Sequence, residues 1–443
     1  MTRLGFPLRR LSDIVDQLVD DHVGIIRDVS HVPREPGAPA FFHVAAKACN
    51  TGAFCRQHNF SIAGGASAKR ERAMAKAIGE AVERYCSAIY EKEEFPLTSY
   101  MDAHFPCVTP KTFALYTQEQ YGQQGFRYAP FEEDTPIRWV LAEDPLSGET
   151  RSVPAAMVYL PYSYDQKEGE IPIVQPISTG LACHGNKALS TISAICEVIE
   201  RDAFTITWQA QLGMPYILID TLSDSNRDLV TRFERVGGSV TLLNITSDVG
   251  VPTILSVLRS HAHDAPALVF AAAADMNPEE AVRKSLEELA HTRRLAQLLK
   301  VSLPPLLPDH QYETIANQDC HVRLYCDHRH TALTDFLFAS DRRMAFDEVE
   351  NCTIGDSSQD LIILLKKIKA IGHQALIKDL TTPDISELGL CVIRALIPGF
   401  HPLYMGHKYR ALGGFRVSQV PSKLGYPRIT NTTGDNPAPH PFP

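Results

Sequence analysis

The chain has 443 residues, of which 44% are hydrophobic and 21% are charged, the balance of an ordinary globular protein with a large core. Its formal net charge of -9 is spread along the sequence without a Lys/Arg cluster, which argues against nucleic acid as the main partner. The sequence has no apolar run long enough for a membrane span or a signal peptide, and its ten scattered cysteines form no Cys-x-x-Cys, so we expect a cytoplasmic protein with reduced thiols and no membrane contact.

The first third of the sequence predicts a short helix, two strands and a long helix. Helical periodicity covers residues 11–19, and Val/Ile/Phe runs bracketed by Pro and Gly predict strands near 23–29 and 40–46. The Gly/Ser stretch SIAGGAS then opens a long helix, which we expect over residues 67–90. Residues 1–60 are therefore interpreted as an N-terminal helix with strands.

Residues 95–165 are Pro-rich and irregular. They carry strand signals at IRWVLAED and VPAAMVYLPY but no long helical pattern. We interpret this segment as an insertion or lid rather than a separate domain.

Helices and strands alternate through the remaining sequence. Two more long helices are expected over 188–211 and 278–299, and between them lie strand signals at YILIDTL, SVTLLNI, TILSVLRS and ALVFAAAA, with a helix at 226–236. Such alternation is typical of sheets covered by helices.

The C-terminal part begins with residues 304–350, which show no clear pattern. A helix is then expected at 359–371, with strands at QALIKDL and LCVIRALI. We predict one α/β (α+β) unit over residues 1–425, followed by a Pro-rich tail, 426–443.

Two of the predicted long helices nearly repeat each other, at GEAVER and CEVIER. On a helix, Glu80 with Glu83 and Glu197 with Glu200 each place two carboxylates on one face. The simplest interpretation is a hydrated acidic stripe on an amphipathic helix. The second helix argues against it, because apolar residues surround nearly all of it.

Paired carboxylates in a largely buried helix need compensating cations. Arg84 and Arg201 directly follow the two pairs. A third, less similar copy of the pattern at KSLEELAHTRR contains Lys284, Glu288 and His291. Three helices with related steps indicate one shared cavity. Carboxylate clusters suit Mg²⁺, and interspersed Arg and Lys suit phosphates, so the residues alone leave a multi-metal nucleotide site and a buried salt-bridge network equally open.

Other binding motifs were weighed as well. Neither a P-loop nor a Rossmann glycine fingerprint occurs in the right context, so a nucleotide site must be of another kind. The segment CHVRLYCDHRH has enough soft ligands for zinc, but its irregular spacing favours a polar surface segment.

The motifs taken together resemble the YcaO superfamily. The resemblance rests on GEAVERY, TGLACHG with CEVIERDAFTITW, PEEAVRKSLEELAHTRR, KDLTTPDISELGLCVIRALIPGFHPL and a terminal PHPFP, and it spans residues 61–443. It implies the YcaO fold, in which mixed sheets are covered by long helices with an internal pseudo-repeat, and a helix-lined site for ATP and Mg²⁺. By position, it implies metal ligands or their close partners at Glu80, Glu83, Glu197, Glu200 and Glu288, and ATP-binding residues at Lys76, Arg84, Ser193, Arg201 and Lys284.

The resemblance also implies a reaction. Members of this family use ATP to activate a backbone amide oxygen, and in the azoline-forming branch a Cys, Ser or Thr side chain of a ribosomally made precursor peptide attacks the preceding carbonyl. The oxygen is phosphorylated and leaves as phosphate, which yields a thiazoline or oxazoline. A Pro-rich C terminus marks this branch, and alternating prolines here stiffen the tail toward polyproline II. We therefore expect the tail to reach the active site and the carboxylate of Pro443 to be catalytic, against the alternative of a disordered terminus.

Three kinds of partner follow from the same resemblance. A separate ThiF-like protein is expected to bind the leader peptide, because only about sixty residues precede the first motif. An FMN-dependent dehydrogenase would be needed for azole products, and a homodimer is the expected assembly.

The alternatives are peptide thioamidation or macrolactamidine formation on the same fold, and a non-catalytic scaffold in which the Glu/Arg steps are structural. This chain also departs from many relatives, with Lys76 in place of serine and Ser-Thr-Gly at residues 178–180 in place of Ser-Asn-Gly.

Overall fold

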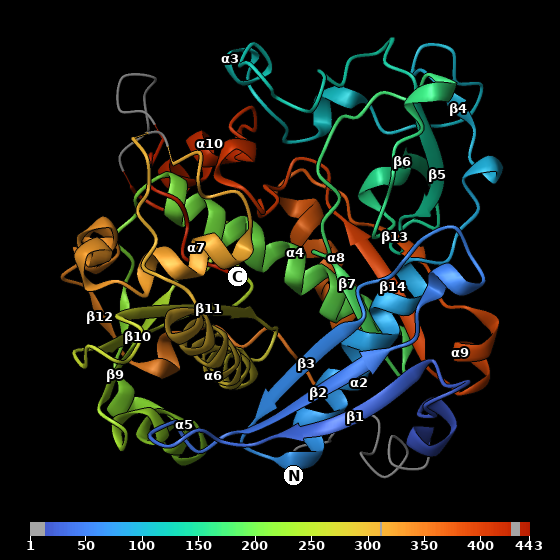
Figure 1. The fold of residues 1–443 in the computed structure, drawn as a ribbon. Coiled ribbons are helices and arrows are strands. Elements are labelled where there is room, and N and C mark those ends of the chain that lie inside the picture. The colour runs from blue at the N-terminus through green and yellow to red at the C-terminus, as the bar shows by residue number, and fades with distance from the viewer. Residues whose placement is uncertain (1–13, 311, 427–434) are drawn as a thin grey trace.

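The computed structural model describes residues 14–310, 312–426 and 435–443, and its framework consists of three sheets with long helices between them (Figure 1). This architecture confirms the predicted α/β class. Residues 11–13 of the first predicted helix and 427–434 of the tail lie outside the described part. Every helix in the described part is too short or too polar to cross a membrane.

The first sheet holds three antiparallel strands in the order β1–β2–β3, namely Ile26–Val32, Phe42–Ala48 and Ile62–Ser67. Helix α2 (Arg70–Ser87) packs on β2 and β3. The helix predicted over 67–90 is α2, but the stretch SIAGGAS before it forms β3, a strand that the sequence did not predict. Its glycines allow a close approach: a Cβ on Gly65 would lie 2.3 Å from the carbonyl oxygen of Ala73 in α2.

The second sheet has five strands in the order β11–β10–β9–β8–β12, which are Leu268–Ala274, Thr253–Ser260, Gly238–Asn244, Tyr216–Ile217 and Arg343–Met344. Helix α6 (Pro278–Ser302) packs on β10 and β11, and α5 (Asp224–Glu234) packs on β9 and α6. The strand predicted at YILIDTL shortens to two residues, since a 3-10 turn, η6 (Ile219–Thr221), follows it.

The third sheet joins the middle of the chain to its C-terminal part. Its order is β4–β5–β13–β14–β7, with β6 paired to β5; the strands are Leu97–Thr98, Ile137–Glu143, Leu376–Asp379, Cys391–Leu396, Leu181–His184 and, for β6, Thr150–Pro154. The segment 95–165 thus contributes strands to a shared sheet. The strand predicted at VPAAMVYLPY ends at Pro154, where the 3-10 turn η4 (Ala155–Met157) begins.

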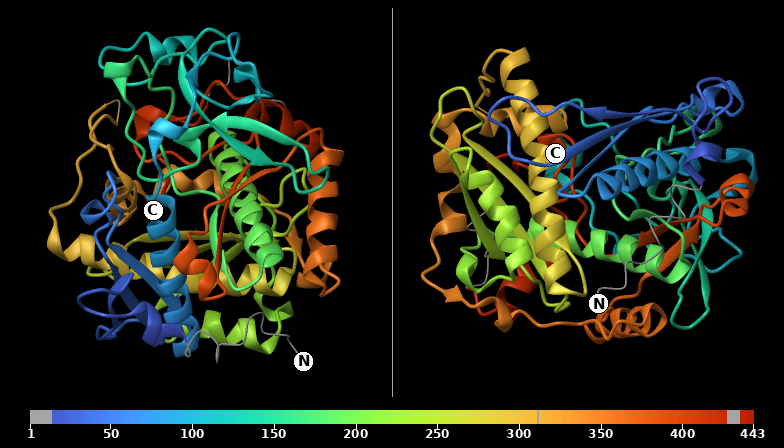
Figure 2. Two further views of the ribbon diagram at one scale, coloured as in Figure 1. Left: turned by 90° about the vertical axis from the view of Figure 1, so that its right-hand side faces the viewer. Right: turned by 90° about the horizontal axis from the view of Figure 1, so that it is seen from below.

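Helix α4 (Lys187–Gln209) runs through the middle of the molecule, as Figures 1 and 2 show. The side chain of Asn186 caps its first turn by accepting from the backbone N–H of Leu189 at 3.0 Å. The helix packs on β7 and β14 of the third sheet, on β10 and β11 of the second, and on α8 (Ser357–Ala370). The backbone of α4, from which its side chains project, is therefore held in place relative to both the second and the third sheet.

The segment 304–350, unclear from sequence, consists largely of short helices: α7 (Gln318–Tyr325), η7 (His328–Phe338) and η8 (Phe346–Glu348). Further short helices are α3 (Gln118–Tyr121), α9 (Pro383–Glu387) and α10 (Arg416–Lys423). The described end of the chain, residues 435–443, lies beside α4 and α7 (Figure 1).

Candidate functional site

The first Glu-x-x-Glu-Arg step lies on α2 and faces both β3 and β7. One carboxylate oxygen of Glu80 accepts from the backbone N–H of Gly64 at 2.7 Å, and the other pairs with Arg84 at 2.5 Å. Glu83 accepts from the backbone N–H of Cys183 at 2.7 Å. Both glutamates are thus oriented by backbone donors from strands remote in sequence, and each keeps further acceptor capacity.

The second step lies on α4. Glu200 pairs with the neighbouring Arg201 at 2.5 Å and accepts from the backbone N–H of Ala274, at the end of β11, at 3.2 Å. Arg201 also lies 3.7 Å from Glu197. Only 11% of the Glu200 side chain is exposed, and Glu197 and Arg201 are about a quarter exposed, so the step is largely but not fully buried.

These carboxylates act on one another. Burial, and then the charge of Glu197, raise the pKa of Glu83 well above its usual range, and burial also raises the pKa of Glu197 although Arg201 and Arg394 oppose it. Burial raises the pKa of Glu200 to about 7 against the effect of Arg201. The two steps, on separate helices, therefore form one cluster in which burial and neighbouring carboxylates disfavour ionisation of Glu83, Glu197 and Glu200.

Helix α6 adds a third wall. Glu288 lies 3.5 Å from His291; although burial opposes it, this hydrogen bond lowers the pKa of Glu288 to about 2. Arg201 and Glu200 both interact with Glu288 electrostatically, which joins α6 to α4. The ring of His291 also lies against β3, since a Cβ on Gly64 would be 2.7 Å from its Nε2 atom.

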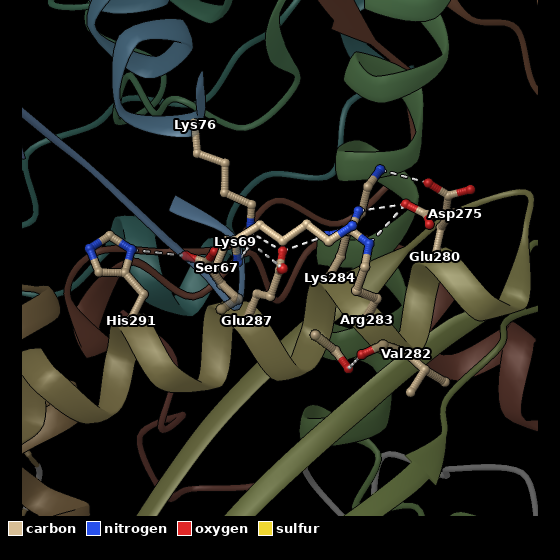
Figure 3. Close-up of polar contacts among 12 residues, drawn as sticks. Ser67, Lys69, Lys76, Asp275, Glu280, Val282, Arg283, Lys284, Glu287 and His291 are labelled. Atoms are coloured by element: carbon tan, nitrogen blue, oxygen red, sulfur yellow. Dashed lines mark hydrogen bonds and ion pairs between the residues drawn. The ribbon is translucent and has the colours of Figure 1, made fainter. Parts of the chain in front are cut away.

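The predicted lysines are held by acids that the sequence did not single out. Lys76 reaches across from α2 to Glu287 on α6 at 3.0 Å, and Lys284 pairs with Asp275 at 2.6 Å (Figure 3). Glu287 is almost fully buried and also binds Ser67 and Arg283. Both lysines thus border the carboxylate cluster, and each is already paired with an acidic side chain.

Ser193 lies on α4 one turn before Glu197 and is half-buried. The structure brings Glu80, Glu83, Glu197, Glu200, Glu288, Arg84, Arg201 and Lys76 into one cluster of interacting charges, while Lys284 lies at its edge with Asp275.

The described C-terminal residues pack along α4 and reach Arg201 of the second step. The indole N–H of Trp208 donates to the carbonyl of Ala438 at 2.9 Å, and the phenol of Tyr325 on α7 donates to the carbonyl of Pro439. Phe442 is buried against Phe204 at a ring distance of 4.3 Å, and the Arg201 guanidinium lies 4.9 Å above the same ring. Pro443 is therefore one residue from the ring that contacts the second Glu-Arg step.

One histidine of the zinc candidate segment, His321, also holds the tail. The ring of His321 stacks on that of His440 at 3.9 Å, and its Nδ1 atom lies 2.7 Å from the carbonyl oxygen of His440. Cys326 is buried with its thiol donating to main-chain carbonyls. These contacts favour a packing role over the zinc alternative.

The donor set fits Mg²⁺. Among the described residues, ligand atoms of three or more side chains gather within 4.8 Å only at Asp20, Asp21 and His22, which are exposed. The carboxylates of α2, α4 and α6 are more widely spaced. This spacing fits Mg²⁺, which takes one or two carboxylates and completes its shell with waters and phosphates. A bound cation would favour the ionised form of these carboxylates and so lower their raised pKa values.

Arg394 is the site residue that sequence reasoning missed. It lies on β14, is 2% exposed and acts on Glu197. A single charged residue inside the apolar run LCVIRALI was the available signal, since a buried arginine needs a partner. Asp275 and Glu287 had no comparable signal.

The chain resembles known proteins over most of its length. Residues 64–401 match the family model described as YcaO cyclodehydratase, ATP- and Mg²⁺-binding. A heterocyclase in complex with substrate and cofactor matches the fold with a TM-score of 0.79 at 18% identity, covering 98% of this chain and 57% of the heterocyclase chain. This chain thus spans little more than half the length of that protein.

Two further solved structures match the fold. YcaO from Methanopyrus kandleri bound with AMPPCP and Mg²⁺ has a TM-score of 0.63 at 20% identity, with 89% of this chain and 90% of that chain covered. The E. coli microcin synthetase McbBCD complex has a TM-score of 0.61 at 14% identity, with 93% and 96% covered. At these identities the likeness concerns the fold.

Proposed function

Since the chain belongs to the YcaO family, whose members are ATP-dependent enzymes that bind Mg²⁺, we propose that it is a cyclodehydratase that forms thiazoline and oxazoline rings. Its substrate would be a ribosomally made precursor peptide whose Cys, Ser or Thr residues are cyclised, in the biosynthesis of a peptide natural product such as a bacteriocin. One observation carries the proposal: carboxylate pairs with an arginine on α2 and on α4, and Glu288 with His291 on α6, converge beside the buried C-terminal tail.

The residue roles follow from the contacts. Glu80, Glu83, Glu197, Glu200 and Glu288 would hold Mg²⁺, which would bridge to the nucleotide phosphates and absorb charge that develops in phosphoryl transfer. Arg201, between Glu197 and Glu200, can keep those carboxylates oriented and offer its remaining donors to a phosphate. Arg84 has the same relation to Glu80.

The chemistry needs a better leaving group. An amide oxygen leaves poorly, and transfer of the γ-phosphoryl group of ATP onto it converts it into phosphate. The Cys, Ser or Thr side chain attacks the preceding carbonyl and closes the ring, its proton passes to a base, and the former carbonyl oxygen of the tetrahedral adduct takes the phosphoryl group. The C–O bond to this oxygen then breaks while the amide nitrogen loses its proton and forms the C=N bond of the ring. ATP becomes ADP, and the oxygen of the amide departs in inorganic phosphate.

The buried C-terminal tail supports ring formation rather than the other reactions proposed for this fold. Its prolines alternate with residues that are buried, and the contacts of Trp208, Tyr325 and His321 fix its course toward Arg201. The carboxylate of Pro443 would be the base that takes the proton from the attacking side chain. Thioamidation and macrolactamidine formation do not call for such a terminus.

The partners are proposed from the same relationship. A separate ThiF-like protein would present the leader peptide, an FMN-dependent dehydrogenase would act where azoles are the product, and the chain would work as a homodimer.

The proposal is tested by incubating the protein with its candidate precursor, a ThiF-like partner, ATP and Mg²⁺. Ring formation lowers the peptide mass by about 18 Da per residue, whereas replacing oxygen with sulfur raises it by about 16 Da. Glu197→Gln should abolish precursor-dependent ATP turnover, and Glu234→Gln, an exposed position on α5, should leave it unchanged. Unchanged turnover in Glu197→Gln would support the scaffold alternative.

A further inference from the structure

Arg394 is a buried cation whose donors are only partly used. Its Nε and Nη2 atoms both donate to the carbonyl of Met157, at 3.0 and 2.7 Å, and Nη2 also donates to the carbonyl of Ile177 at 2.9 Å. The Nη1 atom is buried and has no hydrogen-bond partner among the described residues. The two N–H groups on Nη1 of this fixed guanidinium therefore have no hydrogen-bond acceptor among the described residues.

Leaving such donors unpaired is costly. Burial lowers the pKa of Arg394 to about 10, which still leaves the guanidinium charged at neutral pH. The acidic group that acts on it is Glu197, and within the described part of the chain Arg394 forms no ion pair. A buried charge with open donors is expected to have an anionic ligand in the working state.

The backbone fixes this cation beside the second Glu-Arg step. Strand β14 pairs with β7, and the N–H of Ala395 donates to the carbonyl of Gly180 at 2.8 Å. The N–H of Gly180 in turn lowers the pKa of Glu197. Gly180 has a φ of +87°, and a Cβ there would lie 2.4 Å from the carbonyl oxygen of Ala395, so only glycine allows this contact.

Arg394 and Arg201 therefore approach Glu197 from different elements. Arg201 comes from α4 itself and is paired with Glu200, whereas Arg394 comes from β14, keeps its Nη1 donors open and interacts electrostatically with Glu197. A planar guanidinium held at Nε and Nη2 presents its remaining N–H groups in a fixed direction, which suits phosphoryl oxygens.

We propose that the open Nη1 donors of Arg394 bind the phosphoryl group that is transferred during the reaction. This inference rests on the proposed function. The same phosphoryl group exists in two places, on the nucleotide as the γ-phosphate and afterwards on the peptide oxygen, from which it leaves as inorganic phosphate. Arg394 would hold it in at least one of them.

The test measures nucleotide binding separately from turnover. AMPPCP with Mg²⁺, AMP, and inorganic phosphate with Mg²⁺ are titrated by calorimetry into wild-type protein, Arg394→Gln and Arg394→Lys. Arg138→Gln is the matched control: Arg138 on β5 is 5% exposed and donates to the carbonyls of Lys92 and Phe95, but it pairs with Glu168 outside the site. Thermal melting reports whether each variant is folded.

If Arg394 holds the γ-phosphate, Arg394→Gln weakens AMPPCP binding by about 10- to 100-fold relative to wild type and leaves AMP binding unchanged. If it holds the phosphoryl group on the peptide, AMPPCP binding is unchanged, but the affinity for inorganic phosphate with Mg²⁺ falls by a similar factor. Arg394→Lys keeps the charge and should recover part of either effect, and it remains informative should the Gln variant fail to fold.

The inference is overturned if Arg394→Gln or a folded Arg394→Lys matches Arg138→Gln in its affinity for both AMPPCP and phosphate. Open N–H groups satisfied only by water would give this result. Failure of wild-type protein to bind AMPPCP with Mg²⁺ would instead contradict the proposed function itself, so the two failures are distinguishable.

Discussion

Replacing Glu200 with Gln should stabilise the protein without its ligands at alkaline pH. Glu200 is held at the end of β11 and is largely buried, and burial raises its pKa from 4.5 to about 7. Below pH 4.5 the carboxyl is protonated in both the folded and the unfolded state. As the pH rises toward 7 the unfolded chain releases this proton first, so the free energy of unfolding falls. Above pH 7 the free energy of unfolding has fallen by its full amount, about 3 kcal/mol.

The amide of Gln is neutral at every pH and can still accept from the backbone N–H of Ala274. Glu200→Gln should therefore gain up to about 3 kcal/mol over wild type near pH 8.5 and nothing near pH 4, visible as a melting temperature several degrees higher at the alkaline pH. Mg²⁺ with AMPPCP should stabilise wild type but not this variant, because the metal loses a carboxylate.

Glu287→Gln is the matched control, for which we expect the free energy of unfolding at alkaline pH to fall rather than rise. Although burial opposes it, Lys76 and Arg283 lower the pKa of Glu287, so its carboxylate contributes stability above pH 4.5 that is lost as the pH falls. This variant should lose about 3 kcal/mol or more near pH 8.5, since it breaks a buried pair. If Glu200→Gln were no more stable than wild type at that pH, the account of an uncompensated carboxylate cluster would be refuted.

Three further changes test other parts of the structure. Asp202→Asn should cost about 3–5 kcal/mol in chemical denaturation, because Asp202 is fully buried and binds Arg416 through two nitrogens; a cost below 1 kcal/mol would contradict this. Gly64→Ala should weaken Mg²⁺-AMPPCP binding in calorimetry, since the added Cβ would displace His291 from Glu288; unchanged affinity would speak against α6 as a wall of the site. Deleting Pro443 should reduce ring formation by at least about tenfold in mass spectrometry while the melting temperature stays within about 2 °C, because Phe442 remains to anchor the tail; full activity would exclude a catalytic carboxylate.

The long helices could be predicted because their patterns extend over many residues. Helix α4 was expected at 188–211 and occupies Lys187–Gln209, and α6 begins at Pro278 as predicted. Strand β3 could not be predicted, because its Gly and Ala residues carry no β signal and are explained only by how closely α2 packs on it. The pairing of β5 with β13 links segments more than 200 residues apart, which no local pattern indicates.

The candidate site, like the fold, could be predicted only in part. The i, i+3 spacing placed Glu80 with Glu83 and Glu197 with Glu200 on shared faces, and the structure brings these faces together. Spacing along a helix could not reveal the backbone donors of Gly64 and Ala274, or the acids that neutralise the lysines, because these lie outside the helices that carry the residues they contact or, like Glu287, on a different helix. Arg394 was visible in the sequence only as an isolated charge in an apolar strand.

The central claim, that the oxygen of a peptide amide leaves as phosphate, is tested most directly by isotope transfer. A precursor peptide carries heavy oxygen in the backbone carbonyl that precedes a cyclisable Cys, and is incubated with the protein, its partner, ATP and Mg²⁺. The account predicts that the heavy oxygen is found in inorganic phosphate, one atom per ring formed. Rings formed with unlabelled phosphate, or with the label in water, would contradict it.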